Sequence, residues 1–127
     1  MRGQCDGNEL QLEPEIASRL TAQSATQDRS MLEVTLANFC QRWQIAEFYL
    51  FGSVLRDNFC SDSDIDVMVK FTPDAQWGFE FAAIKRELEE LFGREVDLLT
   101  KASIEASHNW IRRKEILDTA RLIYVAG

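Results

Sequence analysis

The sequence is poor in the residues on which many enzymes and secreted proteins depend. It has one histidine, three cysteines and two prolines among 127 residues. A lone histidine, His108, excludes a His-rich metal site, and no nucleophile-elbow sequence accompanies it to suggest a Ser-His-Asp hydrolase. Three cysteines without paired spacing indicate neither a disulfide framework nor a thiolate zinc site. Any chemistry must therefore depend on carboxylates, hydroxyls and cations.

The chain is also short of positive charge and of long apolar runs. It carries 14 Lys and Arg against 21 Asp and Glu, which gives a formal net charge of −7. Nucleic acids and anionic membranes both attract basic residues, so we expect no direct binding to either. No apolar run approaches bilayer length, and the polar start resembles no secretion signal. These absences predict a reduced, cytoplasmic protein.

The residues that are present fit one globular domain with a polar extension. The composition is 46% apolar and 28% charged, which is typical of a folded chain. Residues 1–29 are rich in Gln, Ser, Thr and Glu, and are predicted to form a loosely packed arm. Pro14 is a favourable first residue for a short helix there. Residues 30–127 are predicted to form the domain itself.

Helix and strand patterns alternate through the predicted domain. Ser30 and Glu33 match a capping box that begins a helix ending near Gln44. Strands are predicted over residues 46–51, 64–71 and 95–100, an amphipathic helix over 77–91, and one or two closing helices over 104–117. Residues 122–125 fit either a short strand or the end of the last helix. The alternation predicts an α/β (α+β) fold, with a small mixed sheet and helices mainly on one face.

Two carboxylates lie two residues apart in the second predicted strand. Asp64 and Asp66 therefore project from the same side, where like charges repel unless a cation lies between them. A solvated sheet face would also explain the pair. Its apolar neighbours, however, indicate a well-packed strand, and Mg²⁺ prefers a few carboxylates together with phosphate oxygens.

A glycine–serine pair precedes these acids by ten residues. Gly52 ends the first predicted strand, where it allows a tight turn and a close approach to a ligand, and Ser53 would begin a short helix that favours phosphate. An ordinary turn with a serine cap is the alternative. Asp97 lies in the third predicted strand. If that strand neighbours the second, three carboxylates converge, as two-metal chemistry requires.

The spacing resembles the DNA polymerase beta-like nucleotidyltransferase superfamily, whose signature is Gly-Ser, ten residues, Asp-x-Asp and a later Asp. Within it, the chain resembles the minimal nucleotidyltransferases, and among these the MntA-like antitoxins of HEPN–MNT toxin–antitoxin pairs. The stretches that carry the resemblance are FGSVLRD at 51–57, DSDIDV at 62–67, RRKEIL at 112–117 and IY at 123–124.

The resemblance implies a nucleotidyltransferase fold, a chemistry and a set of site residues. Asp64, Asp66 and Asp97 would hold Mg²⁺, two ions in all, and catalyse transfer of AMP from ATP with release of pyrophosphate. Gly52 and Ser53, joined by Arg56 and Ser63, would bind the nucleotide. The acceptor would be a tyrosine hydroxyl of a cognate HEPN ribonuclease toxin, with which the protein would form a hetero-oligomer.

Two other functions fit the same residues. One is a nucleotidyltransferase that acts on a small-molecule hydroxyl, of the aminoglycoside type, although 127 residues leave little room for an acceptor pocket. The other is an antitoxin without catalysis that neutralises its partner by binding alone. The intact acids argue against this second alternative, because a binding protein has no need of them.

Overall fold

The computed structural model describes residues 9–10, 16, 20, 29–55, 64–73 and 80–126. Within these residues, a sheet of five strands has the order β1–β5–β2–β3–β4. The strands are β1 (Glu9–Leu10), β2 (Ile45–Phe51), β3 (Ile65–Phe71), β4 (Val96–Thr100) and β5 (Arg121–Val125). β3 and β4 run parallel, and all other pairs are antiparallel. The predicted mixed sheet is confirmed, and the undecided final segment is a strand.

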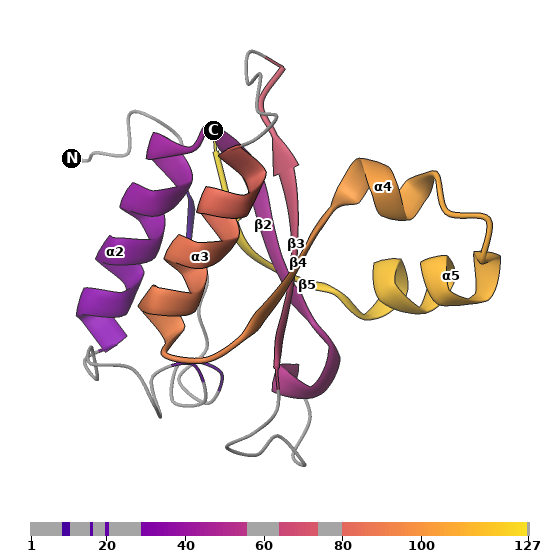
Figure 1. Ribbon diagram of the computed structural model, residues 1–127, viewed down its shortest axis with the longest axis horizontal. Helices are drawn as coiled ribbons and strands as arrows, with labels where there is room; N and C mark the ends of the chain where they lie inside the picture. The colour runs from indigo at the N-terminus through magenta and orange to yellow at the C-terminus, as the bar shows by residue number, and fades with distance from the viewer. Residues whose placement is uncertain are drawn as a thin grey trace.

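Two helices, α2 (Arg29–Arg42) and α3 (Glu80–Phe92), lie side by side over one face of the sheet (Figure 1). Alternate residues of the strands face them, because successive side chains of a strand point to opposite sides. The core between the layers contains fully buried side chains from every layer, among them Leu36, Phe39, Phe48, Leu50, Ile65, Val67, Val69, Ile84, Leu88 and Phe92. α3 also provides the crossover that parallel pairing of β3 and β4 requires.

The predicted start of the second helix, at residue 77, lies outside the described residues, and the other ends of these helices match the sequence except at one residue. Gly93 has a φ of +71° and stops α3, as predicted, and Gln44 with a φ of +58° follows α2. Ser30, predicted to cap α2, instead lies inside it because the helix already begins at Arg29. A capping residue needs a non-helical backbone, so Ser30 cannot have that role.

The expected arm contributes to the core at every residue whose burial is described. β1 pairs antiparallel with β5 and extends the sheet, and Leu10 packs against the core. Ile16 and Leu20 are both helical and buried. Leu10, Ile16 and Leu20 therefore pack on or within the core, and most other residues of the expected arm lie outside the described residues.

The second face of the sheet carries a short helical pair that projects from the body of the molecule (Figure 1). It consists of α4 (Lys101–Glu105), capped by Thr100, and α5 (Trp110–Thr119), capped by Asn109. Ile104 and Ile116 from this pair form a small buried cluster with Phe51 of β2 and Met68 of β3. His108 lies exposed between the two helices. None of the described helices is both long and apolar enough to cross a membrane.

Candidate active site

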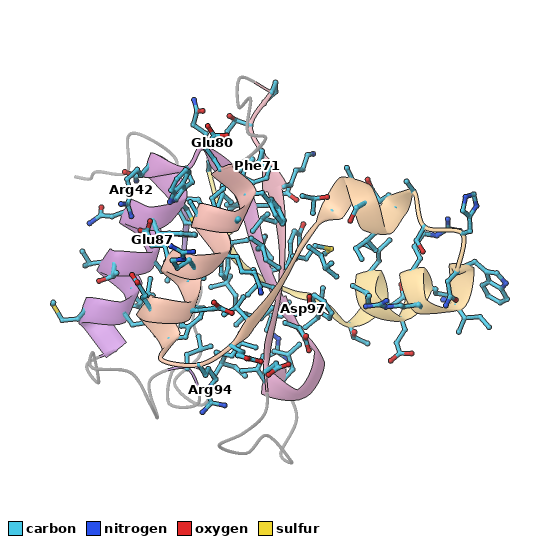
Figure 2. The ribbon with its side chains drawn as sticks, viewed as in Figure 1. Arg42, Phe71, Glu80, Glu87, Arg94 and Asp97 are labelled. Atoms are coloured by element: carbon cyan, nitrogen blue, oxygen red, sulfur yellow. The ribbon has the colours of Figure 1, made fainter. Side chains whose placement is uncertain are left out.

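Asp66 and Asp97 are direct neighbours on adjacent parallel strands. The register pairs Asp66 of β3 with Asp97 of β4, so both side chains leave the sheet on the same face. Met68, two residues further along β3, packs on Ile104 and Ile116, which identifies that face as the one under α4 and α5. Figure 2 shows Asp97 at the centre of the molecule, between the α2–α3 layer and α5. The predicted adjacency of the second and third strands is confirmed.

Gly52 lies against the Asp66 carboxylate. Phe51 pairs with Asp66 across β2 and β3, and Gly52 follows at once, where the chain turns into the 3₁₀ helix η2 (Gly52–Leu55). Gly52 has a φ of +79°, and a Cβ atom built on it would lie 2.1 Å from Asp66 Oδ2. No other residue type fits both this backbone and this contact. The absence of a side chain at Gly52 therefore makes room for the carboxylate of Asp66, an acid that follows it in the sequence motif.

A cavity of about 200 Å³ opens beside these two residues. The sheet contributes Phe51, Gly52 and Asp66 to its wall, and α5 contributes the rest. The α5 residues of the wall are Arg112, Glu115, Ile116 and Thr119. A ligand in this cavity would contact an acid of the strand and a guanidinium of the helix together, as a metal-bound phosphate requires.

Asp64 immediately precedes β3 and is exposed. Across the described part of the chain, no three acidic, His or Cys side chains gather closely enough to hold a metal ion. Mg²⁺, however, is usually held by one or two carboxylates, with water and substrate phosphates as its other ligands. The Asp66–Asp97 pair and the open cavity beside Asp66 fit that requirement.

The other residues expected to bind nucleotide are less fully described. Arg56 and Ser63 lie outside the described residues, and for Ser53 only the backbone, within η2, belongs to them. Their assignment to nucleotide binding stays a prediction.

The α5 contribution to the cavity is a feature that the sequence analysis missed. Positions 112, 115, 116 and 119 recur at helical spacing and form one face of α5, although only Ile116 in that set is apolar. The basic start of the helix therefore resembles a solvated surface when the sequence is considered alone. Within the described residues, the Arg112 guanidinium has no hydrogen-bond or ion-pair partner, so it is available to a ligand.

A second polar group on this face, also missed, joins β2 to the start of α4. The Tyr49 hydroxyl donates to Glu47 Oε1 at 2.6 Å, and Lys101 Nζ lies 3.4 Å from both oxygens. The hydrogen bond from Tyr49 holds the pKa of the Glu47 carboxyl below its usual value. Burial, together with Glu47, raises the pKa of Tyr49, which stays a neutral donor. The group fixes α4, and thus the helical pair, on the sheet.

Comparison with known proteins agrees with this geometry. Residues 32–123 match the family described as nucleotidyltransferase domain. MJ1379 of Methanocaldococcus jannaschii, named as a protein adenylyltransferase, is 38% identical over 85 residues, which are 66% of this chain and 80% of that protein. Protein adenylyltransferase MntA of Thermococcus cleftensis is 33% identical over 66 residues, 52% of this chain and 66% of its own length.

Two solved structures share the fold. One, described as a minimal nucleotidyltransferase, superposes with a TM-score of 0.56 at 29% identity and covers 73% of this chain and 89% of its own. A chain from a toxin–antitoxin complex with AMP-PNP gives a TM-score of 0.54 at 16% identity, covering 70% of this chain and 69% of its own, and shows likeness of fold alone. The match over residues 32–123, on the strands that bring Gly52, Asp66 and Asp97 together, means that this chain belongs to the nucleotidyltransferase domain family.

Proposed function

We propose that this protein is an antitoxin that transfers AMP from ATP to a tyrosine hydroxyl of its cognate HEPN-type toxin. The observation that carries the proposal is Gly52, whose missing side chain lets the turn after β2 lie directly against the Asp66 carboxylate, beside Asp97 and an open cavity. A surface that only bound a partner would need neither the positive φ nor this close approach of backbone to carboxylate. The reaction takes place in the cytoplasm, where ATP is plentiful.

The chemistry asks the protein chiefly for alignment and for neutralisation of charge. The acceptor oxygen forms a bond to the α-phosphorus, the bond from that phosphorus to the bridging oxygen breaks, and pyrophosphate leaves with the electron pair. The proton of the acceptor hydroxyl passes to the Asp97 carboxylate. A tyrosine hydroxyl has a pKa near 10, so a carboxylate beside it eases the loss of its proton.

Asp64, Asp66 and Asp97 are the residues that would hold magnesium, two ions in all, which supply Lewis-acid neutralisation of the triphosphate. The chain itself holds Asp66 and Asp97 on the paired strands β3 and β4, with Asp64 just before β3, and Gly52 brings the turn after β2 close to Asp66. The backbone of Gly52 and Ser53 would bind the β and γ phosphates, together with Arg56 and Ser63. An acidic chain can bind a polyanion in this way.

The comparisons support the choice of acceptor. Two relatives with 38% and 33% identity carry the name of protein adenylyltransferases, and one of them is called MntA. A chain of like fold occurs in a toxin–antitoxin complex that contains an ATP analogue. These names favour a protein acceptor over a small molecule such as an aminoglycoside. They also favour a hetero-oligomer with the toxin.

The test is transfer of labelled AMP to the toxin by the full chain with Mg²⁺ and ATP. We expect the double variant Asp64→Asn/Asp66→Asn to transfer labelled AMP to the toxin at least about 100-fold more slowly, because electrostatic stabilisation of the transition state is lost. Asp118→Asn makes the same chemical change at an exposed position of α5 and should keep full labelling. Both variants should have the circular dichroism spectrum of the parent protein.

Mass spectrometry of the toxin separates the alternatives. A toxin heavier by one or more adenylyl groups, placed on tyrosine by fragmentation, supports the proposal. An unmodified toxin in a tight complex would identify a masking antitoxin, and labelling of a small alcohol in place of the toxin would identify the aminoglycoside type. Unchanged labelling in the double variant would refute catalysis at this site.

A further inference from the structure

A second cavity, of about 190 Å³, lies next to the first on the same face of the sheet. Its apolar wall is formed by Leu99 at the end of β4, Ile104 of α4 and Ile116 of α5. The rest of its lining is polar and comes from two serines and two arginines of the helical pair. Nothing in the proposed chemistry at Asp66 uses this cavity.

The two cavities adjoin each other. Arg112 and Ile116 line both of them, so one side chain of each residue separates the two spaces. Leu99 follows Asp97 by two residues on β4, and two residues of a strand span about 6.6 Å. The second cavity is therefore within reach of a ligand whose phosphates lie at the acids.

We propose that the second cavity holds the nucleoside, base and ribose, of the nucleotide whose phosphates lie at Gly52 and Asp66. The inference rests on the proposed function, since it names the part of the site that receives the remainder of ATP. Leu99, Ile104 and Ile116 form an apolar surface on which a flat base is buried. Arg112 stands at the junction, where a guanidinium can meet a phosphate or stack on an aromatic ring.

The two hydroxyls of the cavity have complementary capacities left for a ligand. Ser103 Oγ donates its hydrogen to Thr100 O at 3.0 Å, so towards a ligand it can only accept. Ser107 Oγ accepts from the backbone N–H of Asn109 at 3.2 Å and keeps its own hydrogen for donation. An acceptor and a donor on the rim of an apolar cavity suit a base edge or ribose hydroxyls better than a hydrocarbon.

The two arginines of the cavity differ in role. Arg113 Nη1 donates to the backbone oxygens of Glu105, at 3.4 Å, and Ser107, at 3.2 Å, and thereby fixes the link between α4 and α5. Arg112 makes no such contact within the described residues. Arg113 therefore shapes the cavity, whereas Arg112 is available to the nucleotide.

The experiment measures binding of ATP and of inorganic tripolyphosphate, each with Mg²⁺, to the full chain without toxin by calorimetry. Tripolyphosphate supplies the phosphates without the nucleoside. We expect ATP to bind more tightly than tripolyphosphate. Leu99→Trp, which fills the second cavity, should weaken ATP binding at least tenfold and leave tripolyphosphate binding unchanged. Val34→Trp places the same indole at an exposed position of α2 and should change neither affinity.

A second variant guards against misfolding of the first. Ser103 is exposed on α4, so Ser103→Leu adds bulk at the rim of the second cavity without disturbing a buried side chain. It should also weaken the binding of ATP and leave the binding of tripolyphosphate unchanged. Undiminished ATP binding in the folded variants would overturn the inference, and so would equal affinity of the parent for the two ligands. Normal ATP binding with reduced AMP transfer would instead identify the second cavity as the acceptor site and overturn it too.

Failure of the proposed function gives a different pattern. In that case the toxin gains no AMP, while the parent still prefers ATP to tripolyphosphate and Leu99→Trp still removes the preference. The second cavity would then be a nucleoside site in a protein that does not transfer AMP to its partner.

Discussion

The two faces of β3 differ sharply although they belong to the same seven residues. Ile65, Val67 and Val69 face α2 and α3 and are completely buried. Asp66 and Met68 face the helical pair of α4 and α5, where one is an acid beside a cavity and the other belongs to a small cluster. Period-two alternation allows one strand to anchor the core and to present the chemistry, because its two sets of side chains never share an environment.

The coverage of the two faces follows from this difference. Burying a carboxylate costs far more than burying a methyl group returns, so an acid is accommodated more easily beside an open cavity than under a complete helical layer. α4 and α5 cover only part of their face and leave two cavities between helix and strand. The comparison teaches that the α2–α3 face should determine stability, and the α4–α5 face should determine activity.

The largest expected effect on stability lies on the α2–α3 face. Phe39 of α2 is fully buried in the core, so Phe39→Ala should lower the free energy of unfolding by about 3–5 kcal/mol. Urea denaturation measures this loss. AMP transfer per folded molecule should stay near that of the parent, and a large fall in it would break the separation between the faces.

A matched pair of glycines tests the activity of the other face. Gly52 and Gly93 have similar positive φ values, +79° and +71°, so the backbone strain that alanine introduces should cost about 1–2 kcal/mol of stability at either position. Only Gly52→Ala also places a methyl group against Asp66 Oδ2. We expect AMP transfer to fall at least about 100-fold in Gly52→Ala, as removal of one stabilising group typically does, and to persist in Gly93→Ala. Equal activity of the two variants would contradict the role assigned to Gly52.

A smaller effect is expected at the Glu47–Tyr49–Lys101 group. The pKa of Glu47 is lowered from 4.5 in the folded protein, chiefly by the hydrogen bond from Tyr49. A lowered pKa stabilises the fold above that value, and the contribution is lost as the pH falls below it. Glu47→Gln should therefore cost about 1 kcal/mol at pH 7 and progressively less as the pH falls below 4.5.

Urea midpoints of the two proteins between pH 7 and pH 3 measure that convergence, with about 1 kcal/mol as the scale. The Lys114–Asp118 pair on α5 provides a control, since both of its side chains are more than half exposed. Asp118→Asn removes a carboxylate charge from that exposed pair. A constant difference between Glu47→Gln and the parent at every pH would show that the carboxylate charge has no part in fixing α4.

The smallest effect is expected at Lys114, which pairs with Asp118 at 2.8 Å on the exposed side of α5. Both side chains are more than half exposed, so solvent and salt screen the pair. Lys114→Ala should leave both the urea midpoint and AMP transfer within experimental error of the parent. Arg112→Ala, two residues away but in the cavity wall, should lower AMP transfer, and equal behaviour of the two variants would remove Arg112 from the site.

Much of the frame was predictable because its signals are local. Strand alternation at residues 64–71 and the glycine stop at position 93 depend on neighbours in sequence, and the structure has both within one or two residues. The packing of the early arm was not predictable. Ile16 and Leu20 stand at the four-residue spacing of the short helix expected after Pro14, and both are helical, but their polar neighbours do not indicate that both are buried in the core.

By itself, the sequence determined the pieces of the site, namely a glycine at a turn and acids at fixed spacing in strands. Only the tertiary structure decided that Asp97 lies beside Asp66, because strand pairing depends on contacts far apart in the chain. It also decided that α5 closes the cavity with Arg112, a residue that resembles an ordinary surface cation. Local patterns arise from backbone geometry over a few residues, whereas a cavity exists only where separate elements pack imperfectly.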